Sequence, residues 1–414
     1  MKIKNIRARE ILASGGQPSV EVKVTLESGV FGVASVSYGA SAGSKEAFVL
    51  FDGDNKRYNG KGMLLAVNNV NEKIASVVVG MDASDQRAVD EAMLKADGTE
   101  NKSNLGANAI LGVSMACARA QAAAEGLELY QYLQQAFGIS ERPKLPKPLA
   151  VFIEGGKHAD NSTDLQEYIL AVSKEQSATE NVRMMEEIYQ ALKKILKENN
   201  FSTNVGNEGA FAPAGIADNE KPLKFITEAI GKAAYQIKVD AGIYIDAAAS
   251  EFFKDGKYNL ATENKVLTAE EMMAKYVEWC KKYPILALED GLSEFDWDNW
   301  PKLLSAAENV KIVADDLTVT NTKLWQQAID KKCANAILIK LNQAGTVTET
   351  VDCCMLAKKY NFFTIPSHRG GGETNDTFLV DLAVAVGSEW IKVGPTRGER
   401  VCKYNRLMEI ESSI

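Results

Sequence analysis

Short runs of apolar residues that end abruptly in charged residues dominate the second half of the chain. Such a run is typical of a strand that is buried on both faces and carries polar chemistry at its C-terminal tip. Four of them follow one another, at residues 242–246, 284–290, 310–316 and 336–340. Each is followed by a segment with helical spacing, so the pattern is strand, charged tip, helix, repeated. It predicts an α/β protein with a (β/α) barrel, whose strand tips carry the active site.

Acidic residues occupy three of these tips. Asp246, Glu289 and Asp315 would converge at the mouth of the barrel, where oxygen ligands suit Mg²⁺ or Mn²⁺. Each acid alone is more simply interpreted as the N-cap of the following helix. Their repetition at consecutive tips favours a divalent-metal site. Lys340 ends the next strand, where an amine near a divalent cation can lose its proton and act as a general base.

The first third of the chain has a different pattern. Residues 20–26 alternate between apolar and polar, which predicts a half-buried strand. Residues 62–80 and 108–126 have helical spacing, and the second segment is so rich in small apolar residues that we expect a buried helix. The run of small residues at 38–44 is either a mobile lid or, more simply, an ordinary connection.

Three prolines at positions 143, 146 and 148 mark a break in this pattern. Closely spaced prolines interrupt helix and sheet alike. We therefore predict two domains, 1–142 and 143–414, of which the second is long enough for a barrel of roughly 250 residues.

Charge and composition narrow the class of protein. The chain has 414 residues, 46% of them hydrophobic, and a net charge of −8. Interspersed charges with an acidic balance argue against nucleic acid or an anionic membrane as a partner. Six cysteines without regular spacing are interpreted as reduced thiols. With neither an N-terminal apolar signal stretch nor an apolar run long enough to span a bilayer, we expect a cytoplasmic enzyme.

Both histidines lie beside glycines at predicted strand ends. Taken singly, His158 and His368 indicate little, because a buried histidine with one hydrogen-bond partner is common. His368, however, opens a glycine-rich loop with Arg369, in which backbone amides and a guanidinium can grip an anion. Lys392 adds a second inward lysine, and Glu208, in a glycine-flanked loop, either faces the site or is solvated. Together they indicate an anionic substrate and proton abstraction next to a carboxylate, with metal ions stabilising the enolate.

Several motifs together resemble those of one known family. Residues 8–12, 103–108, 315–321, 340–343 and 403–406, and a Ser-His-Arg loop before Gly-Glu-Thr, are similar to segments of enolase, phosphopyruvate hydratase. The resemblance extends over essentially the whole chain. It implies an enolase-type (β/α)8 barrel whose second strand is antiparallel, an N-terminal α+β domain, a Mg²⁺ requirement, and a homodimer or larger ring.

The resemblance also implies a role for each matching residue. Asp246, Glu289 and Asp315 would hold the main Mg²⁺. Lys340 would remove the C2 proton, while Glu208, assisted by Glu167, would help the C3 hydroxyl to leave. Arg369 would hold the phosphoryl group. The remaining substrate contacts would come from His158, Gln166, His368, Gly370 and Lys392.

Departures from the family's motifs are concentrated in a few places. Where the family has Asp-Ser-Arg-Gly-Asn-Pro, residues 13–18 read Ala-Ser-Gly-Gly-Gln-Pro. In the lid, which includes Ser41, the family's metal-binding serine is replaced by Tyr38, so that a second Mg²⁺ site is in doubt. Glu154 replaces an asparagine. In the loop that carries Glu208, Asn207 replaces an aspartate and Ala210 replaces a glycine. In the loop after Arg369, Gly370 replaces a serine, and this chain has one glycine more than the family.

Three functions are therefore compared. The changes favour a diverged paralogue that performs the same elimination on an altered phospho- or phosphono-carboxylate, such as a carboxyphosphonoenolpyruvate synthase of phosphonate natural-product biosynthesis. The alternative is an ordinary enolase that interconverts 2-phosphoglycerate and phosphoenolpyruvate. A non-catalytic homologue that serves as a binding protein is disfavoured, because the proton-transfer residues Lys340 and Glu208 are present.

Overall fold

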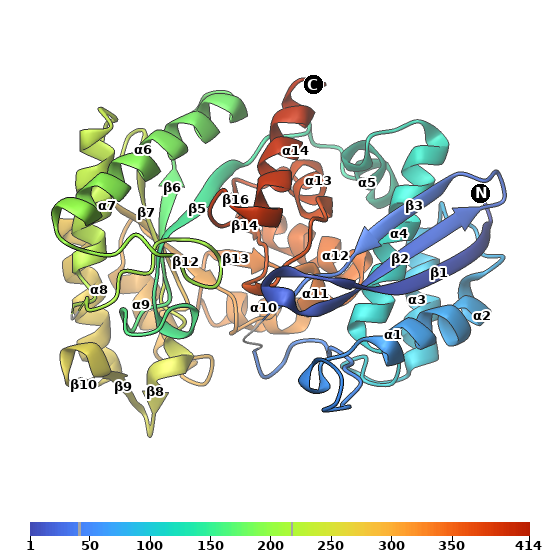
Figure 1. Cartoon of the computed structure of the whole chain (residues 1–414), viewed down its shortest axis with the longest axis horizontal. Coiled ribbons are helices and arrows are strands. Elements are labelled where there is room, and N and C mark those ends of the chain that lie inside the picture. The colour runs from blue at the N-terminus through green and yellow to red at the C-terminus, as the bar shows by residue number, and fades with distance from the viewer. Residues whose placement is uncertain (40–42, 217) are drawn as a thin grey trace.

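The N-terminal part of the protein is a small sheet covered by helices. The computed structural model describes residues 1–39, 43–216 and 218–414. Three strands form an antiparallel sheet in the order β1-β2-β3 (blue in Figure 1), with bounds Ile3–Leu12, Pro18–Leu26 and Phe31–Ser35. The helices of this part are α1 (Leu64–Asn68), α2 (Ala75–Val78), α3 (Gln86–Asp97), α4 (Ala107–Glu125) and α5 (Leu129–Phe137).

The sequence pattern of this part is confirmed. Residues 20–26 lie in β2, where Val22 and Val24 point into the core. The expected helix at 62–80 is formed by α1 and α2, joined by a wider π-helical segment, Asn69–Ile74. Helix α4 is buried as expected and lies so close to β3 that a side chain on Gly32 would come within 2.3 Å of the Ala116 carbonyl oxygen. Small residues on both elements therefore permit this packing.

The second part is a closed barrel of eight strands. Their order is β14-β13-β12-β11-β7-β6-β5-β16, and a parallel bridge between Ser367 and Lys392 closes the circle. Strand β6 is antiparallel to both neighbours, as the resemblance implied, and the other neighbouring pairs are parallel. The strands are β5 (Lys147–Glu154), β6 (Glu167–Val172), β7 (Ala241–Asp246), β11 (Ile285–Glu289), β12 (Lys311–Ala314), β13 (Ala336–Ile339), β14 (Phe363–Pro366) and β16 (Trp390–Lys392).

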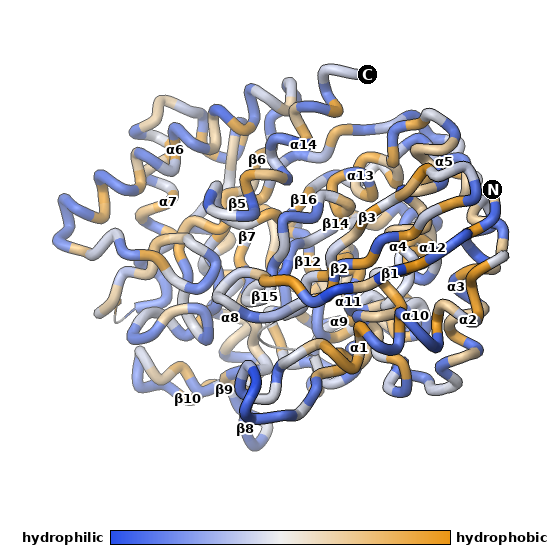
Figure 2. Tube along the Cα trace, turned by 45° about the vertical axis from the view of Figure 1, so that its right-hand side comes forward, coloured by the Kyte–Doolittle hydropathy of each residue, from blue (hydrophilic) through white to orange (hydrophobic). Residues whose placement is uncertain are grey.

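Helices surround the barrel (Figure 1). In Figure 2 the outer helix α6 alternates between hydrophobic and hydrophilic colour, as expected for a helix with one buried face. The helices are α6 (Ala178–Glu198), α7 (Lys221–Lys232), α8 (Ala269–Lys282), α9 (Trp300–Ala306), α10 (Thr322–Asp330), α11 (Leu341–Ala344), α12 (Val347–Lys359), α13 (Phe378–Ala385) and α14 (Val401–Glu411). A small sheet, β8 (Phe253–Lys254), β9 (Lys257–Leu260) and β10 (Lys265–Leu267), follows β7.

One short pairing joins the N-terminal part to the barrel. Strand β4 (Tyr38–Gly39) pairs antiparallel with β15 (Gly371–Gly372), which lies in the glycine-rich loop after β14. The predicted domain boundary between residues 142 and 143 falls in the connection from α5 to β5 and stays a prediction. Among the described residues, no helix is both long and apolar enough to cross a membrane. All six cysteines are free thiols.

Candidate active site

A polar cavity lies at the end of the barrel where the parallel strands terminate. Most of the predicted site residues line it, because successive parallel strands bring their tips to one edge. Those residues are His158, Gln166, Glu167, Glu208, Asp246, Asp315, Lys340, His368, Arg369, Gly370 and Lys392. Residues that the sequence analysis did not assign, Gly39, Ala248, Glu251, Asp290, Asp316 and Ser367, complete the lining.

Lys392 is the centre of a buried cluster of carboxylates. Its Nζ lies 2.8 Å from Asp246 Oδ2, 2.8 Å from Glu289 Oε2 and 3.0 Å from Glu167 Oε2. Burial opposes the charge of Lys392, but Asp246 and the other two acids outweigh it and raise its pKa well above the usual range. Burial, and then repulsion by Asp246, raises the pKa of Glu289 well above its usual value. The tip of the barrel therefore concentrates more negative charge than Lys392 alone neutralises.

Lys340 and Asp315 form the neighbouring ion pair. The Lys340 ammonium contacts Asp315 Oδ2, and Gln343 Nε2 donates a hydrogen bond of 2.9 Å to Asp315 Oδ1. Burial opposes both charges, yet each partner stabilises the other, so the pKa of Asp315 is lowered and that of Lys340 is raised. Asp290 shapes the turn after β12, because its carboxylate accepts the backbone N–H groups of Asp315 and Asp316 at 3.0 and 2.9 Å.

The predicted metal cage fits a hard divalent cation by its chemistry. Asp246, Glu289 and Asp315 offer only oxygen atoms, as Mg²⁺ prefers. Glu289 Oε1 is buried and has no hydrogen-bond partner, which leaves an acceptor for a cation. The ammonium groups of Lys392 and Lys340 already contact these acids, and the three do not form one of the compact ligand groups found among the described residues.

Two other groups do bring three ligand atoms within 4.8 Å of one another. One is Asp290, Asp315 and Asp316, which shares Asp315 with the predicted cage, and the other is His158, Glu167 and Glu208. The acidic clusters can thus hold a metal.

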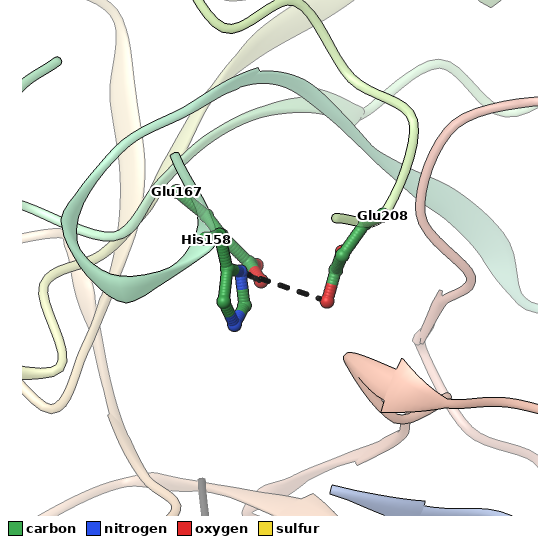
Figure 3. Close-up of side chains that lie close together, drawn as sticks. All are labelled: His158, Glu167 and Glu208. Atoms are coloured by element: carbon green, nitrogen blue, oxygen red, sulfur yellow. Dashed lines mark ion pairs between the residues drawn. The ribbon is translucent and has the colours of Figure 1, made fainter. Parts of the chain in front are cut away.

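The side chains of His158 and Glu208 both line the cavity and face each other. His158 Nδ1 lies 3.3 Å from Glu167 Oε1 and 3.7 Å from Glu208 Oε1 (Figure 3). Burial disfavours a charged imidazole, but hydrogen bonding and attraction by the acids outweigh it and raise the pKa of His158 to about 9. Burial, and then the charge of Glu167, raises the pKa of Glu208 to about 8. Burial and the charge of Glu167 therefore favour the protonated form of Glu208 at neutral pH.

His368 lies near the other carboxyl oxygen of Glu208. Its Nε2 is 3.4 Å from Glu208 Oε2, and its Nδ1 accepts a hydrogen bond of 3.1 Å from Arg400 Nε. Burial and the adjacent Arg400 guanidinium lower the pKa of His368 well below its usual value. The neutral imidazole is therefore favoured, and because Nδ1 accepts the Arg400 hydrogen bond, its proton is on Nε2.

Arg369 is balanced by an acid that the sequence analysis missed. Its guanidinium contacts Glu46 at 3.1 Å, and both side chains are nearly inaccessible, 4% and 5% exposed. Glu46 also accepts a hydrogen bond of 3.2 Å from Gln343. No periodicity marks Glu46, which is a single acid after a run of small residues.

Of the two predicted lid residues, Tyr38 is buried in the described structure and Ser41 is not among the described residues. Tyr38 is buried and packs edge-on against Phe51, with ring centroids 5.6 Å apart. Its ring lies against Gly372, where an added side chain would come within 2.7 Å of it. Of the part of the chain that the structure describes, Gly39 and not Tyr38 lines the cavity. Ser41 lies outside the described residues.

The comparison with protein families agrees with this geometry. Residues 3–133 match the family model described as Enolase, N-terminal domain. Residues 142–414 match the model described as Enolase, C-terminal TIM barrel domain. Together the two matches take in nearly all of the sequence, including every residue assigned to the cavity. With its antiparallel second barrel strand and its acids and lysines at the strand tips, the chain belongs to the enolase family.

Proposed function

We propose that the protein is a Mg²⁺-dependent lyase that eliminates water from a 2-phosphoglycerate-like acid to give an enolpyruvate. The observation that carries this proposal is that Lys340 and Glu208 line the same cavity. The pKa of the Glu208 carboxyl group is raised to about 8, which favours its protonated form. Lys340 can take a proton once its ammonium group has lost its own, and Glu208 can give one. The elimination needs both.

Lys340 and Glu208 divide the reaction between them. The Lys340 amine takes the proton from C2, and the electron pair of that C–H bond is delocalised into the substrate carboxylate as an enolate. The same electron pair then returns to form the C2=C3 double bond. The C3–O bond breaks, and the Glu208 proton passes to the leaving hydroxyl, which departs as water. Glu167 keeps Glu208 protonated through its own negative charge.

Charge compensation prepares Lys340 for this role. Asp246, Glu289 and Asp315 would hold Mg²⁺, which would supply positive charge to offset these carboxylates and the negative charge that develops on the substrate. With the charge of Asp315 offset in this way, the main cause of the raised pKa of Lys340 would be removed. Burial and the nearby positive charges of Arg369 and Lys392 would then favour the free amine. Lys392 and Arg369 then orient the anionic ends of the substrate.

The favoured substrate is one with an altered phosphoryl end. Gly370 offers no hydroxyl where the family's motif has serine, and the Arg369 guanidinium is paired with the Glu46 carboxylate, so a plain phosphate would find one contact fewer and a countercharge to displace. A carboxyphosphonoenolpyruvate synthase-like activity in phosphonate biosynthesis satisfies this condition. The second candidate, ordinary glycolytic enolase, is favoured by the intact pair of Lys340 and Glu208.

One assay separates the two candidates. The purified protein is mixed with 2-phosphoglycerate and Mg²⁺, and enol formation is followed by absorbance beside an ordinary enolase. A comparable rate identifies a housekeeping enolase. Near-silence from folded protein that binds Mg²⁺ supports the altered substrate and directs the search to 2-substituted glycerates with a bulkier phosphonyl group. Failure of Mg²⁺ to bind contradicts the metal assignment.

Oligomeric state and location complete the proposal. We expect a homodimer or higher homo-oligomer that acts in the cytoplasm on a small anionic phospho- or phosphono-carboxylate, with no nucleic-acid or membrane partner. Sedimentation of the purified protein tests the first expectation. A monomer at micromolar concentration would contradict it.

A further inference from the structure

Glu154, which ends strand β5, is a buried acid to which the proposed reaction gives no role. Its side chain is inaccessible, and both carboxylate oxygens accept backbone N–H groups of the loop that carries Glu208. The Glu208 N–H donates to Oε2 at 3.1 Å and the Ala210 N–H to Oε1 at 2.6 Å. The carboxylate thus holds the loop on either side of the Glu208 side chain.

An amide at position 154 cannot make the same pair of contacts. A carboxylate has only acceptors, whereas the amide of asparagine or glutamine has one acceptor and one donor. The donor would face one of the two N–H groups and leave it without a partner in a buried site. Asparagine is in addition one methylene shorter. The acid at position 154 is therefore matched to this conformation of the loop.

The loop is shaped to receive this acid. Gly206 N–H donates to the Ala210 carbonyl at 3.0 Å, and Val205 and Phe211 form an antiparallel bridge. A side chain on Gly206 would come within 2.4 Å of Glu154 Oε2. The absence of a side chain at Gly206 thus makes room for Glu154.

Gly370 does the same for the carboxyl group of Glu208. A side chain at position 370 would come within 2.4 Å of Glu208 Oε1 and 3.1 Å of the His158 ring. A serine here would displace Glu208, its own loop or the imidazole. Two departures from the family's motifs, Glu154 and Gly370, therefore bear on the same residue, Glu154 on the backbone of its loop and Gly370 on its carboxyl group.

Glu154 also acts on Glu208 through charge. Burial raises the pKa of Glu154 to about 7, against the two N–H groups and His158. Its charge is one of those that raise the pKa of Glu208, after burial and Glu167. The charged or titratable groups that face Glu208 are His158, Glu167, His368, Arg400 and Glu154.

We propose that Glu154 is a positioning residue that holds the proton donor Glu208 against Gly370, and that Glu154 and Gly370 together set the orientation of the donor in this chain. The inference rests on the proposed function and deepens it. By this inference, the departures from the family's motifs affect the region around Glu208, where the hydroxyl would leave, as well as the region around Arg369, where the phosphoryl group would bind.

The test compares the wild-type holoenzyme with Glu154→Asn and Glu154→Gln. We expect elimination to fall roughly 10- to 100-fold, as for a displaced catalytic group, with a smaller change in KM. Exchange of the C2 proton with solvent, which needs Lys340 alone, should persist. The alkaline limb of the kcat profile should move to lower pH, because loss of a neighbouring negative charge lets Glu208 lose its proton more readily.

A readout without substrate separates this proposal from the proposed function. Infrared difference spectra of the Mg²⁺-loaded protein follow the carboxylic acid band of Glu208, assigned by its loss in Glu208→Gln. In the wild type this band should persist to a pH of about 8, and in Glu154→Asn it should vanish at lower pH. An inactive wild type with this shift refutes only the proposed function. An unchanged band and an unchanged pH profile overturn the role of Glu154.

Glu411→Gln is the matched control. Glu411 also accepts two backbone N–H groups, those of Ala178 and Thr179 at 2.5 and 3.0 Å, but it does so at the start of α6. This variant should lose stability as Glu154→Gln does, without moving the pH profile. If both variants behave alike, Glu154 is only structural and the proposal fails. Gly370→Ser provides a second approach that leaves Glu154 intact, and it should also reduce elimination more than C2 exchange.

Discussion

The two sides of the cavity are built on different principles. On the Lys340 side, charged groups project from strand tips and neutralise one another in direct ion pairs, as Lys392 does with Asp246 and Glu289. On the Glu208 side, the proposed proton donor comes from a loop, and burial and a like charge disfavour its ionised form. The comparison teaches that a base can be held ready by removable countercharge, whereas an acid needs a site that resists ionisation.

Removing the base should have the largest effect. We expect Lys340→Ala to lower turnover by roughly 10⁴-fold, at the upper end of what general base catalysis contributes. It should abolish elimination and C2 proton exchange together, while far-UV circular dichroism and Mg²⁺ binding stay close to wild type. Exchange that survives in the purified variant would assign the base to another residue.

Removing the proposed acid should separate C2 proton exchange from elimination. Glu208→Gln keeps the size of the side chain but cannot donate its proton, so elimination should fall by roughly 10²- to 10³-fold. Lys340 is untouched, and solvent exchange at C2, followed by NMR in deuterium oxide, should continue. Equal loss of exchange and elimination would show that the two sides do not act as separate units.

The pH profile tests the same distinction without a mutation. Because the pKa of Glu208 is raised to about 8, its protonated form is present below that pH and is lost above it. The kcat for elimination should therefore fall as the pH rises through about 8. A profile that stays flat to pH 10 with the fold intact would contradict the acid role of Glu208.

A substitution at the phosphoryl end should have a moderate effect. Glu46→Gln removes the carboxylate that balances Arg369, so a doubly charged phosphoryl group should bind about tenfold more tightly, equivalent to about 1.4 kcal/mol. The KM for 2-phosphoglycerate, measured at constant ionic strength, should fall. A higher KM would mean that Glu46 orients Arg369 for the substrate instead of competing with it.

Metal binding should have a modest effect on stability. Mg²⁺ at a concentration 100 times its dissociation constant should stabilise the fold by about 2.7 kcal/mol, because it binds only the folded cage. Thermal unfolding with and without a chelator measures this gain. Glu289→Gln removes a charged ligand and should reduce the gain, whereas Glu411→Gln should leave it unchanged.

The barrel and the strand-tip residues were predictable from the sequence because both follow from local pattern. The apolar runs indicate the strands, and the residue that ends each run indicates the tip. Apolar runs that end in Asp246, Glu289 and Lys340 encode both the strand and the place of its last side chain. The antiparallel course of β6 came only from the resemblance.

The contacts of the loops were not predictable in this way. Glu46 reaches Arg369 from the N-terminal part, and Arg400 reaches His368 from a turn near the end of the chain. No local pattern records such pairings, because tertiary folding brings the partners together. The fit of Glu154 against the Glu208 loop depends likewise on the absence of a side chain at Gly206, and the place of the Glu208 carboxyl group depends on its absence at Gly370. Neither has a signature in hydrophobic periodicity.

The pairing of β4 with β15 has a consequence for biosynthesis. Residues Tyr38 and Gly39 leave the ribosome long before their partners Gly371 and Gly372. At 5–20 residues per second the delay is on the order of tens of seconds. Strand β16, which supplies Lys392 and completes the barrel, is made later still. A nascent chain therefore carries an open barrel edge and an unpaired β4 until translation is nearly complete, and premature termination anywhere before Lys392 yields a product without this lysine and without the Ser367–Lys392 bridge that closes the barrel.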